Sequence, residues 1–237
     1  MNAQQPSSKK LPSSPKLEIA GFEPASQVDW PGKLAAVVFL QGCPWKCGYC
    51  HNFEITDMDK PGIVAWEYVC EHLESRRGLI EGVVFTGGEP TRQSALLSAI
   101  KAVKEMGLEV GLHTNGAYPE KLEPLLPYLD WVGLDVKATS AKYLAVTSVA
   151  EDNVAPMASL RLLLGAHVPV QVRTTLDPLV LDEDDVLEIQ REVGELGVTD
   201  FVVQRVRLDG TNPEYAKALS EYRSKAAHTA NDILPMF

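Results

Sequence analysis

Short apolar runs of strand length alternate with amphipathic helical patterns along most of this 237-residue chain. The apolar runs predict strands at 34–41, 80–86, 108–114, 130–137, 168–175 and 200–206. The helical patterns that follow these runs lie near 64–77, 91–106, 119–127, 151–165 and 182–196, and again after 212. This alternation is typical of βαβ units, so it predicts an α/β fold with parallel strands and outer helices.

Two of the predicted strands carry polar side chains on one face only. In the fourth, period-two alternation separates apolar side chains from Gly133, Asp135 and Lys137. The fifth separates three valines in the same way from Arg173 and Thr175. Because strands covered by helices on both faces are more often apolar throughout, the polar face suits an interior that holds a ligand. The pattern favours a partial (β/α)6 TIM-like barrel, active at the C-terminal ends of its strands, over an open doubly wound sheet.

The bulk composition argues against several classes of partner. The chain has 22 Lys and Arg against 32 Asp and Glu, and this net charge of −10 offers no basic footprint for nucleic acid or anionic lipid. Its longest apolar runs, such as Leu34–Leu40, are far shorter than a membrane span. Residues 1–16 lack an apolar signal core and predict a disordered tail before a single domain at 17–237. We therefore expect a cytoplasmic protein that contacts neither nucleic acid nor a membrane.

Three of the four cysteines lie together, directly after the first predicted strand. Cys43, Cys47 and Cys50 have the spacing C-x3-C-x2-C, which lets one short loop wrap three thiolates around a single cuboidal cluster. Three protein ligands would leave the fourth iron open, and an open coordination position is typical of chemistry rather than scaffolding. The loop therefore predicts a [4Fe–4S] cluster with these three cysteines as ligands.

The alternative for this loop is a structural zinc site, with His51 or Cys70 as the fourth ligand. Cys70 shares a predicted helical face with Trp66, Val69 and Leu73, a pattern typical of a core residue. His51 is adjacent to the third cysteine, which is too close for comfortable tetrahedral closure. Structural zinc sites also usually combine two spaced pairs of ligands, so the iron–sulfur interpretation is favoured.

Three short stretches around the cysteines narrow the interpretation. Val28–Gly32 reads V-D-W-P-G, Phe39–Cys43 reads F-L-Q-G-C, and Cys50–Asn52 reads C-H-N. Over roughly residues 17–206, the chain resembles the radical S-adenosylmethionine superfamily. Through these three stretches it is more narrowly similar to the activating enzymes of glycyl radical enzymes, in the branch for anaerobic ribonucleoside-triphosphate reductase.

The resemblance implies a reaction and a set of partners. A reduced cluster would cleave S-adenosylmethionine to methionine and a 5′-deoxyadenosyl radical, which removes hydrogen from a backbone glycine of the partner reductase. Because no further cysteines are available for auxiliary clusters, the electron would come from an external donor such as flavodoxin or ferredoxin. The alternatives are an activase of another glycyl radical enzyme, a small-molecule enzyme of the 7-carboxy-7-deazaguanine synthase type, and a non-catalytic iron–sulfur or zinc module.

The resemblance also implies which residues bind S-adenosylmethionine. They are Tyr49, Asn52, Gly87, Gly88, Glu89, Thr114, Asn115, Asp135 and Lys137. Arg173, which the alternation of the fifth predicted strand turns to the same inward face, is expected to add a carboxylate or ribose contact. The motif G-G-E-P at 87–90 would hold the methionine ammonium, since paired glycines permit close backbone approach and a carboxylate suits a cation. No residue is expected to act as a catalytic group beyond the cluster and S-adenosylmethionine.

Several of these residues have plainer alternative roles. Asn52 either contacts the ligand or orders the cluster loop by local hydrogen bonds. The G-G-E-P motif alone could be a strand-to-helix turn, and Asp135 with Lys137 could be only a strand-terminal ion pair. His113 stands where related activases carry an aspartate that helps to build a cation site. The replacement removes a carboxylate ligand, and we assign His113 no catalytic role.

Overall fold

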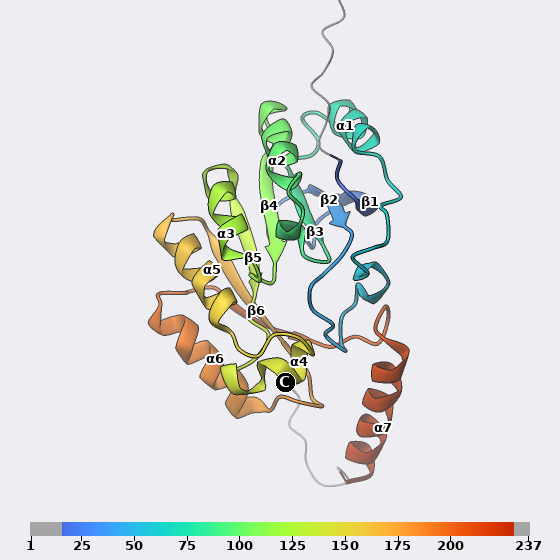
Figure 1. The fold of residues 1–237 in the computed structure, drawn as a ribbon, viewed down its shortest axis with the longest axis vertical. Coiled ribbons are helices and arrows are strands. Elements are labelled where there is room, and N and C mark those ends of the chain that lie inside the picture. Colours follow the sequence, from blue (N-terminus) through green and yellow to red (C-terminus); the bar gives the residue numbers. More distant parts are fainter. Residues whose placement is uncertain (1–15, 230–237) are drawn as a thin grey trace, which may run out of the picture.

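The computed structural model describes residues 16–229, with side chains described up to residue 225. One seven-stranded sheet, in the order β1-β2-β3-β4-β5-β6-β7, forms the centre of the described chain (Figure 1). Apart from Lys16, the tail predicted at 1–16 lies outside the described residues, and the single domain at 17–237 stays a prediction. No helix in the described part is both long and apolar enough to cross a membrane.

The six predicted strands are confirmed to within two residues at each end. They are β2 (Ala35–Leu40), β3 (Gly82–Gly87), β4 (Glu109–Thr114), β5 (Trp131–Asp135), β6 (Val170–Leu176) and β7 (Phe201–Arg205). These six strands run parallel in register from one neighbour to the next. A seventh strand, β1 (Ile19–Ser26), pairs antiparallel with β2 and was not predicted. Gly21 and Pro24 lower the strand propensity of this segment, but an edge strand tolerates both.

The predicted helices are present, and prolines shorten two of them. They are α1 (Trp66–Ser75), α2 (Leu96–Glu105), α3 (Pro119–Leu122), α5 (Val154–Gly165), α6 (Glu183–Glu195) and α7 (Pro213–Thr229). Prolines occur within the 3-10 turns at 90–92 and 123–128, which replace part of the predicted α2 and α3. The short helix α4 (Tyr143–Thr147) was not predicted. Figure 1 shows α7 standing apart from the helices that cover the sheet.

The main apolar core lies between the sheet and its covering helices. Its members from β5 include Val132 and Leu134, and Val136 directly after the strand belongs to the same cluster. All three side chains are fully buried. The predicted parity of this strand is therefore confirmed, and the opposite face carries Asp135 and Lys137 into the interior of the sheet.

A pair of stacked tryptophans fills the interior near the N-terminal ends of the strands. The ring centroids of Trp30 and Trp131 are 5.7 Å apart, with an interplanar angle of 20°. Room for Trp30 depends on two glycines, because a Cβ at Gly82 or Gly111 would lie only 2.9 or 2.8 Å from its ring. The interior is thus packed with apolar rings at one end and left polar at the other.

The sheet curves as a partial barrel and does not close. β1 pairs with β2 and otherwise forms only an isolated bridge from Ile19 to Val64, and β7 pairs only with β6, so these two strands are the edges of the sheet. The predicted α/β fold with a partial barrel of parallel strands is confirmed, with one added antiparallel strand at the edge.

Candidate active site

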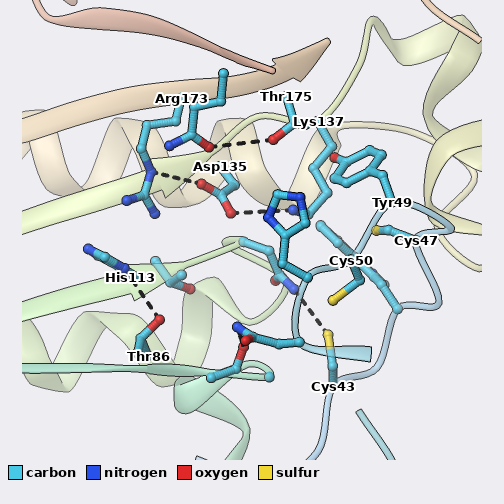
Figure 2. Close-up of a pocket in the computed structure, with 18 of the residues that line it drawn as sticks. Cys43, Cys47, Tyr49, Cys50, Thr86, His113, Asp135, Lys137, Arg173 and Thr175 are labelled. Atoms are coloured by element: carbon cyan, nitrogen blue, oxygen red, sulfur yellow. Dashed lines mark hydrogen bonds and ion pairs between the residues drawn. The ribbon is translucent and has the colours of Figure 1, made fainter. Parts of the chain in front are cut away.

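A cavity of about 710 Å³ lies at the C-terminal ends of the parallel strands (Figure 2). The three cysteines form one side of it, and polar side chains from the strand ends form the other. Of the residues predicted from the sequence, those that line the cavity are Cys43, Cys47, Tyr49, Cys50, Asn52, Gly87, Gly88, Thr114, Asn115, Asp135, Lys137 and Arg173. Glu89 alone is not at the cavity wall.

The cysteine loop is held in place by backbone hydrogen bonds. The amides of Gly42 and Cys43 donate to the carbonyls of Ile55 and Thr56, at 2.8 and 2.9 Å. Burial raises the pKa of the Cys43 thiol to about 12 and that of Cys47 to about 11. Thiolates at these positions therefore need compensating positive charge, which iron supplies when it binds.

The donor set fits an iron–sulfur cluster, because three cysteine side chains line the same cavity. A cuboidal cluster takes one thiolate at each of three irons, so its cysteines lie further apart than the ligands of one ion. Cys70, the other ligand considered for zinc, lies on α1 and packs against the main core.

Gly87 and Gly88 bring the end of β3 against the cysteine loop. Gly87 has a φ of +111°, and a Cβ there would overlap the backbone of Leu40. A Cβ at Gly88 would overlap the carbonyl of Gly42, immediately before the first cysteine. Any larger residue at either position would therefore push the loop away from the strand end.

Glu89 is fully buried behind the cavity wall rather than facing the cavity. Its Oε1 accepts hydrogen bonds from the backbone amide and the hydroxyl of Thr91 and from Thr114 Oγ1, at 3.0, 2.6 and 2.7 Å. Its Oε2 accepts from the Asn115 amide at 2.8 Å. Burial raises the pKa of Glu89, although these hydrogen bonds oppose the shift. The side chain thus ties β3 to the end of β4, and its own backbone amide donates to the Gly42 carbonyl at 2.9 Å.

Asp135, Lys137 and Arg173 form one charged group across two strands (Figure 2). Arg173 Nε donates to Asp135 Oδ1 at 3.0 Å, and Lys137 Nζ donates to Asp135 Oδ2 at 3.3 Å. Gly133 makes room for the guanidinium, since a Cβ there would lie 2.7 Å from it. Burial alone would raise the pKa of Asp135, but Arg173 and Lys137 hold it below its usual range. Two cations against one anion leave this wall positively charged.

Tyr49 lies beside this charged group with its hydroxyl unsatisfied. Lys137 Nζ is 5.7 Å from the centroid of the Tyr49 ring. Tyr49 Oη is buried and has no hydrogen-bond partner among the described residues. Burial also raises the pKa of this phenol, so Oη keeps its proton. An unpaired buried donor at a cavity wall is what a bound ligand with an acceptor atom would complete.

The two asparagines connect the cysteine loop to the strand ends. Asn52 Nδ2 donates to the carbonyl of Gly87 at 3.0 Å. Asn115 Nδ2 lies 3.6 Å from Cys43 Sγ and donates to it. Both side chains also line the cavity, so the ordering role and the predicted ligand contact are compatible.

His113 lines the cavity as a neutral, fixed side chain. Its Nε2 lies 2.7 Å from the backbone carbonyl of Asp29, which only accepts, so Nε2 carries the proton. Its Nδ1 then accepts from Thr86 Oγ1 at 3.3 Å. Burial, with the Arg173 charge nearby, lowers the pKa of His113 to about 4. No local pattern in the sequence predicts this link between β4 and the segment after β1.

Other residues of the cavity wall were not assigned from the sequence. Thr175 and Gln204 lie on neighbouring strands, with Thr175 Oγ1 and Gln204 Oε1 3.5 Å apart. His51 Nε2 accepts from the amide of Arg207 at 3.0 Å, which joins the cysteine loop to the chain after β7. The parity that places Thr175 inward was visible in the sequence and could have identified its neighbour Gln204, whereas the His51 contact had no sequence signal.

Comparison with known proteins identifies the class. The model of the Radical SAM superfamily matches residues 37–218, so the chain belongs to this superfamily. Membership implies S-adenosylmethionine and an iron–sulfur cluster as cofactors, in agreement with the cavity described above. Within the superfamily it is a radical SAM enzyme of the glycyl radical enzyme activating type, as its relatives indicate.

Two relatives support the assignment to the activating enzymes of glycyl radical enzymes. A Methanocaldococcus jannaschii protein named as a glycyl-radical enzyme activating enzyme is 33% identical over 185 residues, which cover 75% of this chain and 76% of that protein. The pyruvate formate-lyase 1-activating enzyme of Escherichia coli K12 is 28% identical over 220 residues, covering 82% and 89%.

A solved structure supports the fold alone. Streptococcus suis SuiB, bound to precursor peptide SuiA, matches with a TM-score of 0.62 at 14% identity over 81% of this chain. The match spans 46% of the length of SuiB.

Proposed function

We propose that this radical SAM activase installs a glycyl radical on anaerobic ribonucleoside-triphosphate reductase. The observation that carries the proposal is the meeting of the cysteine loop and the Asp135–Lys137 pair in one cavity. The choice of this reductase over other glycyl radical enzymes rests on the resemblance of Val28–Gly32, Phe39–Cys43 and Cys50–Asn52 to that branch. The small-molecule alternative is not favoured, because both relatives described above are named as activating enzymes.

Cys43, Cys47 and Cys50 are the proposed ligands of a [4Fe–4S] cluster. When bound and reduced, such a cluster supplies the open iron and the electron with which S-adenosylmethionine is cleaved to a 5′-deoxyadenosyl radical. No other cysteine lines the cavity, and Cys70 packs on the main core, so the electron comes from an external donor such as flavodoxin or ferredoxin.

The strand ends bind and orient S-adenosylmethionine in this proposal. Lys137 presents its ammonium to the ligand carboxylate, while Asp135 keeps Lys137 and Arg173 in position. The backbone at Gly87 and Gly88 receives the methionine ammonium, since its carbonyls can be approached closely. Tyr49 offers its ring face to the adenine, and its unpaired hydroxyl gains a partner.

The packed end of the barrel restricts where a radical can go. The stacked rings of Trp30 and Trp131 close the interior below the polar cavity. The cavity at the C-terminal ends of the strands is therefore bounded by apolar rings on its N-terminal side. A protein substrate would reach it from the open side.

The test is anaerobic incubation of the reduced, cluster-loaded protein with S-adenosylmethionine and the candidate reductase. Electron paramagnetic resonance should then detect a glycyl radical on the reductase, and the Cys47→Ala variant should produce none. Parallel incubation with pyruvate formate-lyase serves as the control for partner choice. A radical on that enzyme alone, or turnover of a small-molecule substrate without any protein partner, would refute the assignment.

A further inference from the structure

The open barrel has two free edges, and they differ in how well they are protected against added strands. β1 contains Pro24, which has no amide proton, and its register with β2 is broken twice by bulges. β7 has the sequence F-V-V-Q-R, without Gly or Pro, and it keeps an unbroken register with β6 from Phe201 to Arg205. β7 thus lacks the proline and the register breaks that blunt β1, and its protection consists of its short length and the charge of Arg205.

The backbone of β7 has free hydrogen-bonding groups on its open side. The amide of Val172 donates to the carbonyl of Asp200 at 2.9 Å, so alternate residues from Asp200 onward face β6. The amides and carbonyls of Phe201, Val203 and Arg205 therefore point away from the sheet. Among residues 16–229, these groups make no backbone or side-chain hydrogen bond. Val203 is 44% exposed, and Gln204 and Arg205 are exposed beside it.

This edge is continuous with the cavity. Gln204 and Arg205 belong both to β7 and to the cavity wall, and Arg207 follows them there. An extended segment lying along β7 would consequently pass the mouth of the cavity, where the reacting group is needed. Helix α7 packs against the chain beyond the strand, where Leu219 and Val206 share an apolar cluster and Arg223 Nη2 donates to the Val206 carbonyl at 3.2 Å.

The charge of the edge differs from that of the whole chain. The net charge is −10, and the strand itself with the two residues after it, 201–207, reads F-V-V-Q-R-V-R, with two arginines between the flanking Asp200 and Asp209. Both arginines are exposed, and neither forms an ion pair with another described residue. Arg173, by contrast, is already paired with Asp135. The free positive charge at the mouth suits carboxylates on whatever binds there.

We propose that the partner protein's glycine-bearing segment binds in extended form as an added strand on β7, with acidic side chains beside Arg205 and Arg207. This inference rests on the proposed function, because it concerns the protein substrate of the same cavity. Main-chain hydrogen bonds supply affinity that does not depend on side chains, as in other cases of strand addition. Glycine at the central position allows the peptide backbone to approach the cavity closely.

A proline at Val203 tests the main-chain contact. Val203→Pro removes an amide proton that faces away from β6, and an edge strand tolerates proline at such a position. The variant should fold, bind iron and cleave S-adenosylmethionine without a partner as the unmodified protein does. Its affinity for a capped peptide Glu-Thr-Val-Gly-Val-Thr-Glu, measured anaerobically by fluorescence anisotropy, should fall about tenfold. The matched control Val203→Thr keeps the amide and should change the affinity by less than about twofold.

Changes in the peptide test the same contact should Val203→Pro fail to fold. N-methylation of the peptide amides that face β7 should abolish binding, and N-methylation of the amides between them should leave binding intact. The reason is that a strand offers every second amide to its neighbour. Replacing both glutamates by lysines should weaken binding about tenfold or more. Equal loss at every N-methylated position, or no preference for the acidic peptide, would overturn the proposal.

Hydrogen exchange at Val203 and Arg205 distinguishes other occupants of the edge. Protection of these amides that appears only with the peptide supports the proposal. Protection without peptide that grows with protein concentration would assign the edge to a second copy of the chain. Protection without peptide that is lost when residues 1–15 or 230–237 are removed would assign it to the chain's own termini. Either result would overturn the proposal.

The inference and the proposed function fail in different ways. Peptide binding with the expected pattern, but no radical on the reductase, would leave the docking edge standing and refute the partner. A glycyl radical formed equally well by the unmodified protein and by Val203→Pro would leave the activity standing and refute the docking edge.

Discussion

Replacement of His113 by glutamine should remove much of the pH dependence of stability in mildly acidic solution. Glutamine retains an N–H donor for the Asp29 carbonyl, but it does not titrate. In the folded protein, burial and the neighbouring Arg173 lower the pKa of His113 to about 4. In the unfolded chain the pKa returns to about 6.5. The folded state therefore binds the proton more weakly than the unfolded state does.

The sign and size of the effect follow from this difference. As the pH falls below about 6.5, the unfolded chain takes up a proton that folded His113 refuses, so the free energy of unfolding decreases. The loss should reach about 2 kcal/mol at about pH 5 and level off near 3 kcal/mol, as an order of magnitude, below about pH 4. At neutral pH His113 causes no such loss of unfolding free energy, because it is then largely neutral in both states.

Urea unfolding of the protein and of His113→Gln, at steps between about pH 7.5 and about pH 5, measures this term. The difference between the two proteins reports His113 together with its coupling to Asp135, because carboxyl groups far from position 113 contribute equally to both. The stability of the variant should decline less by about 2 kcal/mol over this range. Two parallel profiles would refute the assignment of His113 as a group that stays neutral in the folded protein.

Three further substitutions probe the site. Cys47→Ala should abolish both the absorbance of the bound cluster and the reductive cleavage of S-adenosylmethionine, whereas retention of either would exclude Cys47 as a ligand. Lys137→Ala should keep the iron content but weaken S-adenosylmethionine binding about tenfold in equilibrium dialysis, since a charge-assisted contact is lost. Unchanged affinity would make the lysine purely structural. Gly88→Ala should lower the free energy of unfolding by about 2 kcal/mol and reduce iron loading, because its Cβ would overlap the Gly42 carbonyl. Full iron loading at wild-type stability would contradict that contact.

Much of the architecture follows from local patterns in the chain. Strand positions depend on runs of apolar and β-branched residues, and these predicted β2 to β7 closely. The inward direction of Asp135, Lys137 and Arg173 depends only on the period of two along a strand, so it too could be read locally. The prediction of the cysteine loop required only the spacing of its three cysteines along the chain.

Other features depend on which distant segments meet. β1 looks unlike a strand because of Gly21 and Pro24, and it exists only because β2 offers an edge to pair with. Trp30 fills the barrel because glycines on two other strands leave it space, which no local pattern reveals. Glu89 lies in a motif expected to face the ligand, yet donors on β4 and the following turn hold its carboxylate behind the wall.

The alternation of strands and helices thus determined the class of fold, and the spacing of three cysteines determined the chemistry to look for. Tertiary structure alone decided that the sheet stays open, that β1 is blunted while β7 keeps an unbroken edge, and that His113 stays neutral. The physical reason is that periodicity encodes the direction of a side chain relative to its own strand. What the side chain meets there depends on packing between segments far apart in the sequence.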